Sequence, residues 1–577
     1  MAISDLSSDA GAPLLEHTVH SCVDYRSRPV HKSSSGGWKS AYFVIAVEMA
    51  ERFAYYGILS NLISYLTGPL GQSTATAAEN VNVWSGTMSL LPLFGAFVAD
   101  SFLGRYRTIV TASVVYVLGM GSLTLSALLP SLSSSDCQNT NKFSLCSPYE
   151  SQVILFFLSL YIVALGHSGH KPCVQAFGAD QFDEHDPEEC KMRSSFFNWW
   201  YFGICVVSFL TYLIINYIQD NLSWGLGFGI PCICIIVGLL VFLLGTKTYR
   251  YGIKRNNEKT PFVRIGQVFV AAFRNRQISP SAMVVEEEAW EILSEEQFKF
   301  LNKALFVPDG SNKFGKVCSI RDVEDVKALL RLVPIWTTNL VYGIVLAQSS
   351  TIFTKQGATM DRSIIAGFDL PAASLQSIIS LSILVTMPIY DRVFVPSAQV
   401  FTGKPSGITM LQRIGTGLFL SAMSMVTAAL VEMKRLKTVE KYGLFDELNV
   451  TIPMSVWWLV PQYSLIGVSE IFAMVGLQEF FYDQVPTELR SVGLSLNLSI
   501  FGFGSFLSSF LISAIDKKTG GDGQYSWFAD NLNQAHIDYF YWLLGGINTI
   551  GLMVFLHFSK LYIYRNRREY TCRNVGR

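Results

Sequence analysis

The stretch VEMAERFAYYG, residues 47–57, places three charged side chains inside a run, 38–66, that otherwise has the composition of a membrane-spanning helix. A charge at the centre of a bilayer costs roughly 2.5–3.5 kcal/mol on insertion scales, so such residues are rare and are functional by default. Glu48, Glu51 and Arg52 are therefore expected to face the interior of a helical bundle rather than lipid.

The composition of the whole chain is that of a membrane protein. Of its 577 residues, 50% are hydrophobic and 15% are charged, whereas about 25% charge is usual in soluble proteins. Lysine plus arginine equals aspartate plus glutamate, at 44 each, so no basic field indicates nucleic acid. Residues 1–36 lack the apolar core and cleavage site of a signal peptide. The expected main partner is the lipid bilayer.

Twelve apolar windows have the length of about 20 residues that crosses a hydrocarbon layer. The expected spans are 38–66, 77–99, 106–129, 150–177, 195–218, 224–245, 329–353, 371–390, 408–431, 454–482, 491–515 and 537–563. Because a polar stretch separates the first six spans from the last six, we predict an all-α membrane protein with twelve transmembrane helices in two six-helix bundles.

The same pattern divides the chain. The expected parts are an N-terminal tail at 1–36, bundles at 37–245 and 329–563, a linker at 246–328 with an amphipathic helix at 286–305, and a C-terminal tail at 564–577. Basic residues flanking the spans place both tails and the linker in the cytoplasm. One loop, after span nine, disagrees, because Lys434, Arg435, Lys437 and Lys441 would face outward. In another outward loop, Cys137 and Cys146 are either a disulfide or two free thiols.

Ionisable side chains well inside the spans are confined to three of the twelve. They are Glu48, Glu51 and Arg52 in span one, His167, His170 and Lys171 in span four, and Glu470 in span ten. In a duplicated transporter, spans one, four and ten are equivalent members of three-helix repeats, and such repeats place the substrate site between them. This distribution predicts a transport site at the centre of the two bundles.

The acids of span one outnumber the base beside them. Glu48 and Arg52 are four residues apart with the acid first, the better orientation for an ion pair on a helix. One arginine cannot neutralise two carboxylates, so the leftover acid is a natural proton carrier. The alternative is a closed ion-pair cluster that only locks helix one to a neighbour.

The other buried charges need partners from elsewhere. Lys171 requires a counter-charge, either an anionic substrate or a glutamate in a permanent salt bridge. Glu470 has no basic residue within one turn, so its partner comes from another helix or from the substrate. His167 and His170 are expected to be packing residues or a proton relay rather than metal ligands, because a cation adjoins them. We expect no metal and no cofactor apart from the coupling proton, and the sequence contains no enzyme motif such as HExxH.

These residues resemble those of the proton-coupled oligopeptide transporter family of the major facilitator superfamily, in its plant nitrate and peptide transporter branch, NPF. The resemblance covers about residues 24–565 and is closest to the fifth subfamily of the branch. Helix one carries the family's E-x-x-E-R element, followed by Tyr55 and Tyr56. HKPCVQAFGADQFD at 170–183 and FYDQVPTELRS at 481–491 match two family signatures, and GAFVADSFLGRYR at 95–107 resembles the superfamily's loop between helices two and three.

The resemblance implies the fold of that superfamily and a symporter of the rocker-switch type. Glu48 and Glu51 would then be the proton sites, with Arg52 as their partner, Lys171 an anion or carboxylate contact, and Glu470 the group that holds a substrate amine. We also assign Tyr55, Tyr56 and Gln348 to the substrate site. Asp100 and Arg105 would brace the inward gate. Arg105 with Thr108 matches the R-x-x-T pattern of a kinase site, which adds a regulatory kinase as a partner.

The resemblance leaves the substrate open between nitrate and small peptides or related solutes. Nitrate-selective relatives have a histidine on helix seven, where this chain has Leu346. A sensor that binds the same solutes without net transport is the alternative function. Leu14 and Leu15 follow an acidic residue, a pattern compatible with the vacuolar membrane, and the plasma membrane is the alternative. The transport unit is expected to be a monomer.

Overall fold

A computed structural model describes residues 18–32, 35–133, 150–183, 186–252, 261–276, 298–305, 318–365, 368–403, 407–447, 450–485, 490–520 and 525–562. Within these ranges, eleven helices are long and apolar enough to cross a membrane. The helix α2 (Gly37–Leu59) is also long enough, and it carries the charges of the first predicted span. The predicted cysteine pair at 137 and 146 and most of the predicted amphipathic helix at 286–305 lie outside the described residues.

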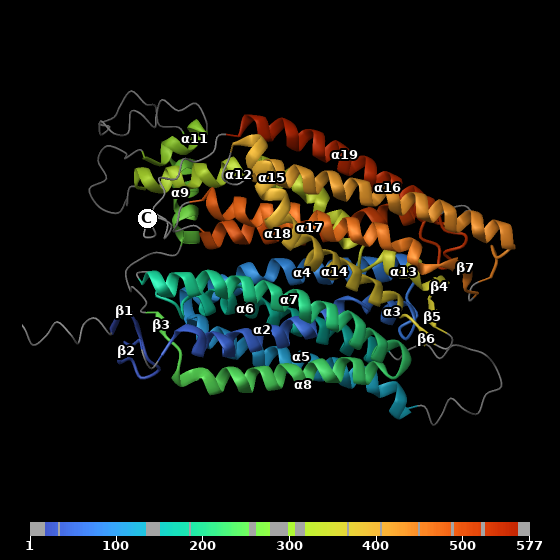
Figure 1. The fold of residues 1–577 in the computed structure, drawn as a ribbon, viewed down its shortest axis with the longest axis horizontal. Coiled ribbons are helices and arrows are strands. Elements are labelled where there is room, and N and C mark those ends of the chain that lie inside the picture. The colour runs from blue at the N-terminus through green and yellow to red at the C-terminus, as the bar shows by residue number, and fades with distance from the viewer. Residues whose placement is uncertain are drawn as a thin grey trace, which may run out of the picture.

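The helices form two bundles that lie side by side with their axes along the long dimension of the molecule (Figure 1). The first bundle contains α2, α4 (Thr74–Val98), α5 (Arg105–Ser133), α6 (Glu150–Ala179), α7 (Pro187–Asn221) and α8 (Trp224–Leu244). The second contains α12 (Ile320–Ala347), α14 (Ser377–Ile389), α16 (Met410–Tyr442), α17 (Val460–Asp483), α18 (Arg490–Thr519) and α19 (Ile537–Leu561). Two of these helices are followed by shorter ones: α14 leads through the π-helical turn η7 (Tyr390–Phe394) into α15 (Val395–Thr402), and α13 (Ile352–Ala358) follows α12. Each predicted span overlaps one of these helices.

Helix starts follow capping chemistry. Ser319 and Asp322 form a reciprocal capping box at the start of α12, and Thr409 and Gln412 form another at the start of α16. These bonds satisfy backbone N–H groups that have no partner within the helix. Because α12 begins at its capping box, it starts nine residues before the predicted span at 329, inside the stretch predicted as linker.

Strand β1 (Thr18–Val23), the last residues of α19 and the described helices of the linker lie at one end of the bundles, here named the terminal end (Figure 1). A small antiparallel sheet joins β1 (Thr18–Val23) to β2 (Pro29–His31) and to β3 (Tyr251–Gly252). The buried Arg250 ties this sheet to α7, because its Nη1 donates to Glu189 Oε2 at 2.6 Å. Lys32 donates to Asp186 at 3.0 Å and thereby holds the pKa of that carboxyl below its usual value.

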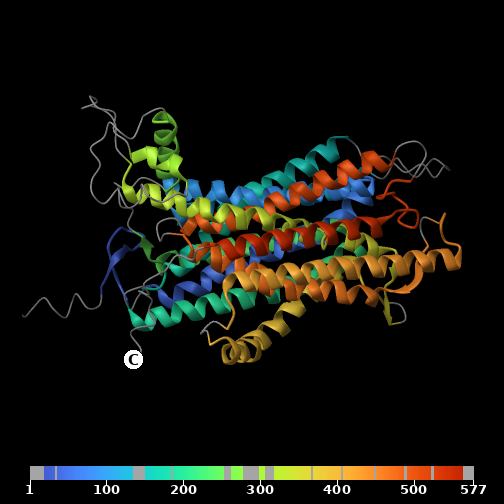
Figure 2. The same cartoon turned by 90° about the horizontal axis from the view of Figure 1, so that it is seen from above.

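The described part of the linker contains an amphipathic helix that begins before the predicted range of 286–305, most of which lies outside the described residues. This helix is α9 (Pro261–Arg274), which packs against α12, the short helix α11 (Lys299–Asn302) and the 3-10 turn η5 (Lys303–Leu305). Seen from above, these segments protrude beside the ends of the bundles (Figure 2).

At the opposite end, named the distal end, hydrogen bonds join the two bundles. Its short segments are α3 (Leu62–Thr67), α13, the 3-10 turn η6 (Ala372–Gln376) and strands β4 (Met360–Asp361), β5 (Ser363–Ile365), β6 (Phe368–Asp369) and β7 (Ile452–Ser455). The backbone N–H of Thr74 donates to Asp530 at 2.8 Å, Lys355 donates to Thr67 at 3.1 Å, and Gln376 donates to the carbonyl of Ser60 at 2.8 Å. Each of these bonds joins one bundle to the other.

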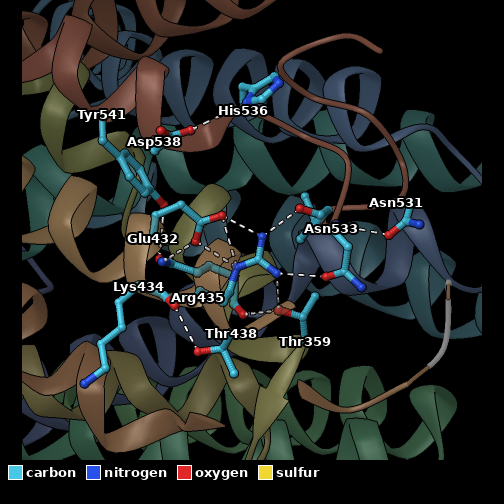
Figure 3. A network of polar contacts seen from close by, with 12 residues as sticks. Thr359, Glu432, Lys434, Arg435, Thr438, Asn531, Asn533, His536, Asp538 and Tyr541 are labelled. Carbon is cyan, nitrogen blue, oxygen red and sulfur yellow. Dashed lines mark hydrogen bonds and ion pairs between the residues drawn. The ribbon is translucent and has the colours of Figure 1, made fainter. Parts of the chain in front are cut away.

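The prediction of a loop after residue 431 is wrong, because α16 continues to Tyr442. Arg435, expected in that loop, is fully buried and binds Glu432, the residue three before it, with Nη2 at 2.6 Å from Oε1 (Figure 3). Arg435 also donates to Asn533 at 3.0 Å and to the carbonyl of Leu532 at 2.6 Å. The helix ends only at Gly443, which adopts the left-handed conformation with φ 67°. Of the four basic residues that disagree with the positive-inside pattern, Arg435 is therefore neutralised inside the protein.

Candidate functional site

The three charges of span one lie together on α2 and are buried. Glu48 and Glu51 are each 1% exposed, and Arg52 is 8% exposed. Arg52 Nε donates to Glu48 Oε1 at 2.8 Å and lies 3.4 Å from Glu51 Oε2. One guanidinium thus contacts both carboxylates, as the helical spacing predicts. Glu48 Oε2 and Glu51 Oε2 have no hydrogen-bond partner in the described part of the chain.

Helix α6 supplies the second contact of Glu51. His167 Nδ1 and Glu51 Oε1 are 2.6 Å apart, and the imidazole is 1% exposed. His170, one turn further, is also fully buried, but its Nε2 lies 2.8 Å from the hydroxyl of Ser113 on α5. The two histidines therefore have different partners, and only His167 contacts a carboxylate.

Glycines let α6 approach its neighbours closely enough to fix these contacts. A Cβ at Gly166 would stand 2.6 Å from the backbone nitrogen of Tyr116, and one at Gly95 on α4 would stand 1.9 Å from the carbonyl oxygen of Ser168. Real Cβ atoms do not approach so near, so only glycine permits this packing. The glycines of the segment GHSGHK therefore set the depth at which His167 meets α2.

A stack of aromatic rings orients the imidazole. The ring centroid of Tyr55 lies 5.3 Å from that of His167 with 15° between the planes, and Trp84 of α4 also stacks on Tyr55, at 6.3 Å between centroids. Trp84 is itself anchored, because its Nε1 donates to the carbonyl of Leu160 at 3.0 Å. Tyr55, predicted to contact substrate, therefore also supports a buried charged group of Glu48, Glu51, Arg52 and His167, which we name the proton-site cluster after the role predicted for its acids.

Lys171 lies on α6 one turn after His167 and is partly exposed. It is close enough to interact electrostatically with Glu48, Glu51 and Arg52. Within the ranges that the structure describes, no carboxylate comes within the 4.0 Å of an ion pair with its ammonium group. The permanent salt bridge considered for Lys171 is thus absent from the described residues.

Glu470 of α17 faces the first bundle across the centre of the molecule. It is partly exposed, and it interacts electrostatically with Tyr56 of α2 and with Tyr201 and Tyr212 of α7. The rings of Tyr56 and Tyr212 meet edge to face at 5.5 Å. Among the described residues, no cationic side chain forms an ion pair with Glu470. Tyr56 and Glu470, both predicted for the substrate site, are therefore brought together.

Gln348 has a different environment from the one predicted for a substrate ligand. It is fully buried, and its Nε2 donates to Ser508 at 2.9 Å and to the carbonyl of Ile344 at 2.9 Å. Ser508 also accepts a hydrogen bond from Asn82 of α4 at 3.0 Å. Gln348 thus belongs to the contact between the bundles, and its contact with substrate stays a prediction.

The residues predicted for the inward gate lie at the terminal end. Arg105 at the start of α5 forms an ion pair with Asp180 just beyond α6. Asp100 lies in the π-helical turn η1 (Ala99–Leu103), and its side chain is outside the described ones. Thr108 is 5% exposed, and its hydroxyl donates to the carbonyl of Gly104 at 3.0 Å. A kinase would reach that hydroxyl only after local opening, so phosphorylation stays a prediction.

Several members of the site could not be selected from the sequence. Ser113 and Tyr116 come from α5, and Tyr201 and Tyr212 come from α7, two spans without well-buried charges. The available signal was a polar hydroxyl inside an apolar span, which occurs at many other positions. Over the described residues, no group of three or more histidine, cysteine or acidic side chains could hold a metal ion.

Comparison with known proteins identifies the family. The family model PTR2, described as POT family, matches residues 106–528. Protein NRT1/PTR FAMILY 5.10 of Arabidopsis thaliana is 63% identical over 98% of this chain and 99% of that protein. Protein NRT1/PTR FAMILY 5.16 of the same plant is 55% identical over 96% of this chain and 98% of that protein.

Solved structures show the same fold. An auto-inhibited POT family peptide transporter superposes with a TM-score of 0.68 at 19% identity, covering 92% of this chain and 99% of the other. The POT family transporter PepTSo gives 0.66 at 20% identity, covering 91% and 98%. A POT family transporter in complex with 5-aminolevulinic acid gives 0.61 at 16% identity, covering 90% and 96%. With two six-helix bundles in the major facilitator arrangement and these relatives, the chain belongs to the POT family of transporters, among its plant NRT1/PTR members, and is not an enzyme.

Proposed function

We propose that this protein is a proton-coupled symporter that carries nitrate, small peptides or related anionic or zwitterionic solutes by alternating access. The observation that carries the proposal is the proton-site cluster, in which two fully buried carboxylates share one arginine. An unbalanced acid inside a membrane is costly when ionised, so it favours taking up a proton. A membrane potential contributes about 2.3 kcal/mol per charge per 100 mV, enough for an entering proton to drive accumulation of a solute.

The substrate site is proposed to lie between Lys171 and Glu470. These two charges have opposite sign, come from different bundles and form no ion pair with each other or with other described side chains. Lys171 suits a carboxylate or nitrate, and Glu470 suits an amine, with Tyr55 and Tyr56 between them. A related transporter was crystallised with 5-aminolevulinic acid, which supports the zwitterionic class for this chain.

The proposed arrangement in the membrane has the terminal end in the cytoplasm, in the vacuolar or the plasma membrane. The hydrogen bonds that join the bundles among the described residues lie toward the distal end. In this arrangement the described conformation is closed on the outer or lumenal side. A rocking motion that breaks these bonds and forms others at the terminal end would complete the cycle.

The test measures uptake of labelled nitrate and of a labelled dipeptide in the same cells, at acid and at neutral pH, together with the evoked current. We expect larger uptake and an inward current at acid pH for one of the two solutes. Glu51→Gln is expected to abolish the current, because the amide cannot bind and release a proton. Binding of the solute by the native protein without any current would instead identify a sensor.

A further inference from the structure

Among the described histidines inside the membrane-spanning helices, only His167 contacts a carboxylate of the cluster, that of Glu51. Its Nδ1 lies 2.6 Å from Glu51 Oε1, and both side chains are 1% exposed. A contact of this length between a carboxylate and an imidazole, away from water, is a strong charge-assisted hydrogen bond with one proton between the two groups. The contact joins α2 to α6 across 116 positions of sequence.

The surroundings of His167 contain few other charges. From α2 it faces Glu51, Arg52 and the ring of Tyr55, and its own helix adds His170 and Lys171. From α5, the hydroxyl of Tyr116 faces Glu51. From α4, the neighbour in the ring stack is Trp84, which does not titrate.

Two nearby groups do not take this role. His170 is equally buried, but its bonded partner is the Ser113 hydroxyl, which carries no charge. Lys171 forms no ion pair with a described carboxylate, although it lies one turn from His167. Among the described basic side chains of α6, only His167 forms a hydrogen bond or ion pair with an acid of α2.

We propose that His167 and Glu51 act as one proton-binding unit of the transport cycle, in which a proton is held between His167 Nδ1 and Glu51 Oε1. This rests on the proposed symport and deepens it, by adding a titratable imidazole to the two acids. Before uptake, the neutral imidazole donates its Nδ1–H to the Glu51 carboxylate. The added proton binds the other ring nitrogen, Nε2, which gives either imidazolium with carboxylate or, if the shared proton moves to Oε1, neutral imidazole with carboxylic acid. In both protonated forms the pair has lost one negative charge, and no other bond changes.

The change of charge links proton and substrate. Without the added proton, the two acids balance Arg52 and Lys171. With the proton, the cluster together with Lys171 carries one net positive charge. Lys171 then attracts an anionic group of the substrate more strongly, because the competing negative charge of Glu51 is cancelled. Loading of the proton thus favours loading of the anion, and release of the proton favours its release.

The experiment compares His167→Gln with His170→Gln in proteoliposomes that contain the full-length protein. Two readouts are used: uphill uptake driven by an inward proton gradient, and exchange of labelled for unlabelled substrate without a gradient. Glutamine keeps a hydrogen-bonding side chain of similar length but cannot titrate between pH 4 and 9. We expect His167→Gln to lose gradient-driven uptake and its pH dependence while exchange persists, and His170→Gln to retain both.

Gradient-driven uptake by His167→Gln with the native pH profile would overturn the inference while leaving the symport itself intact. Absence of pH-dependent transport by the unmodified protein would instead remove the proposed function. If neither His167→Gln nor His167→Asn folds, ¹⁵N-histidine spectra of the unmodified protein in lipid nanodiscs decide the matter. The inference expects that at least one histidine signal protected from a soluble paramagnetic quencher, and therefore buried, changes its protonation between pH 4 and 9. If no protected histidine signal changes, the inference is wrong.

Discussion

At the scale of single residues, Glu470, which has no ion-pair partner among the described side chains, is the acid best placed to distinguish substrates. A charge-assisted hydrogen bond contributes about 1.5–3 kcal/mol, so Glu470→Gln is expected to raise the KM for a dipeptide by roughly ten- to a hundredfold. Nitrate has no amine and should keep its KM within about twofold in the same variant.

The control for this prediction is Lys171→Gln, because both solutes present an anionic group to that side chain. It should weaken transport of the dipeptide and of nitrate alike. Equal losses for both solutes in Glu470→Gln would show that the carboxylate has a structural role instead.

The buried pair of Glu432 and Arg435 allows a prediction about stability. Removing one member leaves an uncompensated charge in the interior, which typically costs 3–5 kcal/mol, so Arg435→Met should lower the thermal midpoint in detergent markedly. Replacing both, with Glu432→Leu and Arg435→Met together, removes the unpaired charge and should restore much of the loss.

Lys434→Met is the matched control, since Lys434 is an exposed neighbour whose ammonium lies 3.1 Å from the centroid of the Trp458 ring. An exposed cation–π contact contributes roughly 0.5–1 kcal/mol, so this variant should shift the midpoint only slightly. A single Arg435→Met variant as stable as the native protein would contradict the role of the pair.

At the scale of helices, the close contact between α4 and α6 decides where His167 sits. In Gly95→Ala the new Cβ would overlap the backbone of Ser168 at 1.9 Å, so α6 must move away. Overpacking of this kind costs about 1–3 kcal/mol, and the shift should separate His167 from Glu51. We expect slower proton-driven uptake together with a lower thermal midpoint.

Gly121→Ala on α5 is the control, because a Cβ there meets nothing within 4 Å. Alanine favours a helix over glycine by about 1 kcal/mol, so this variant should be as stable as the native protein or more so and should transport normally. Normal transport by Gly95→Ala would show that the position of α6 tolerates displacement.

At the scale of the whole molecule, the contacts between the bundles gather toward the distal end, and transport by alternating access requires them to separate. The hydroxyls of Ser208 on α7 and Ser380 on α14 are 2.9 Å apart, one on each bundle. In a cysteine-depleted background, the pair Ser208→Cys and Ser380→Cys should form a disulfide on oxidation. The two side-chain ends are already close, and a small movement would bring the sulfurs to the bond length of about 2.05 Å.

The oxidised pair is expected to stop uptake completely, and a reducing agent should restore it. Each single cysteine variant, treated with the same oxidant, controls for damage elsewhere. Full uptake by a protein shown to be crosslinked would mean that the bundles need not separate at this contact.

How far the sequence reaches can be argued from particular elements. The twelve spans were predictable because the bilayer demands long apolar segments, and the charged face of α2 was predictable because i, i+3 and i+4 spacing is local. The extension of α16 to Tyr442 was not, because hydropathy counts four basic residues and cannot register that one of them is buried against Glu432, Asn533 and a backbone carbonyl. The linker helix α9 was not predicted either, since its 14 residues begin at Pro261 among the basic residues that follow span six, while the helix predicted at 286–305 stays a prediction.

Composition and short-range spacing were enough to predict the membrane class, the two sets of six helices and the three spans that carry the buried charges. Helix packing had to be known before it was clear that Glu51 meets His167, that Lys171 and Glu470 lack ion-pair partners among the described residues, and that the bundles are joined toward the distal end. Those facts depend on which helices pack together and how deeply. Such packing is set by many small contacts between distant parts of the chain, such as glycines against backbone, and no local pattern records it.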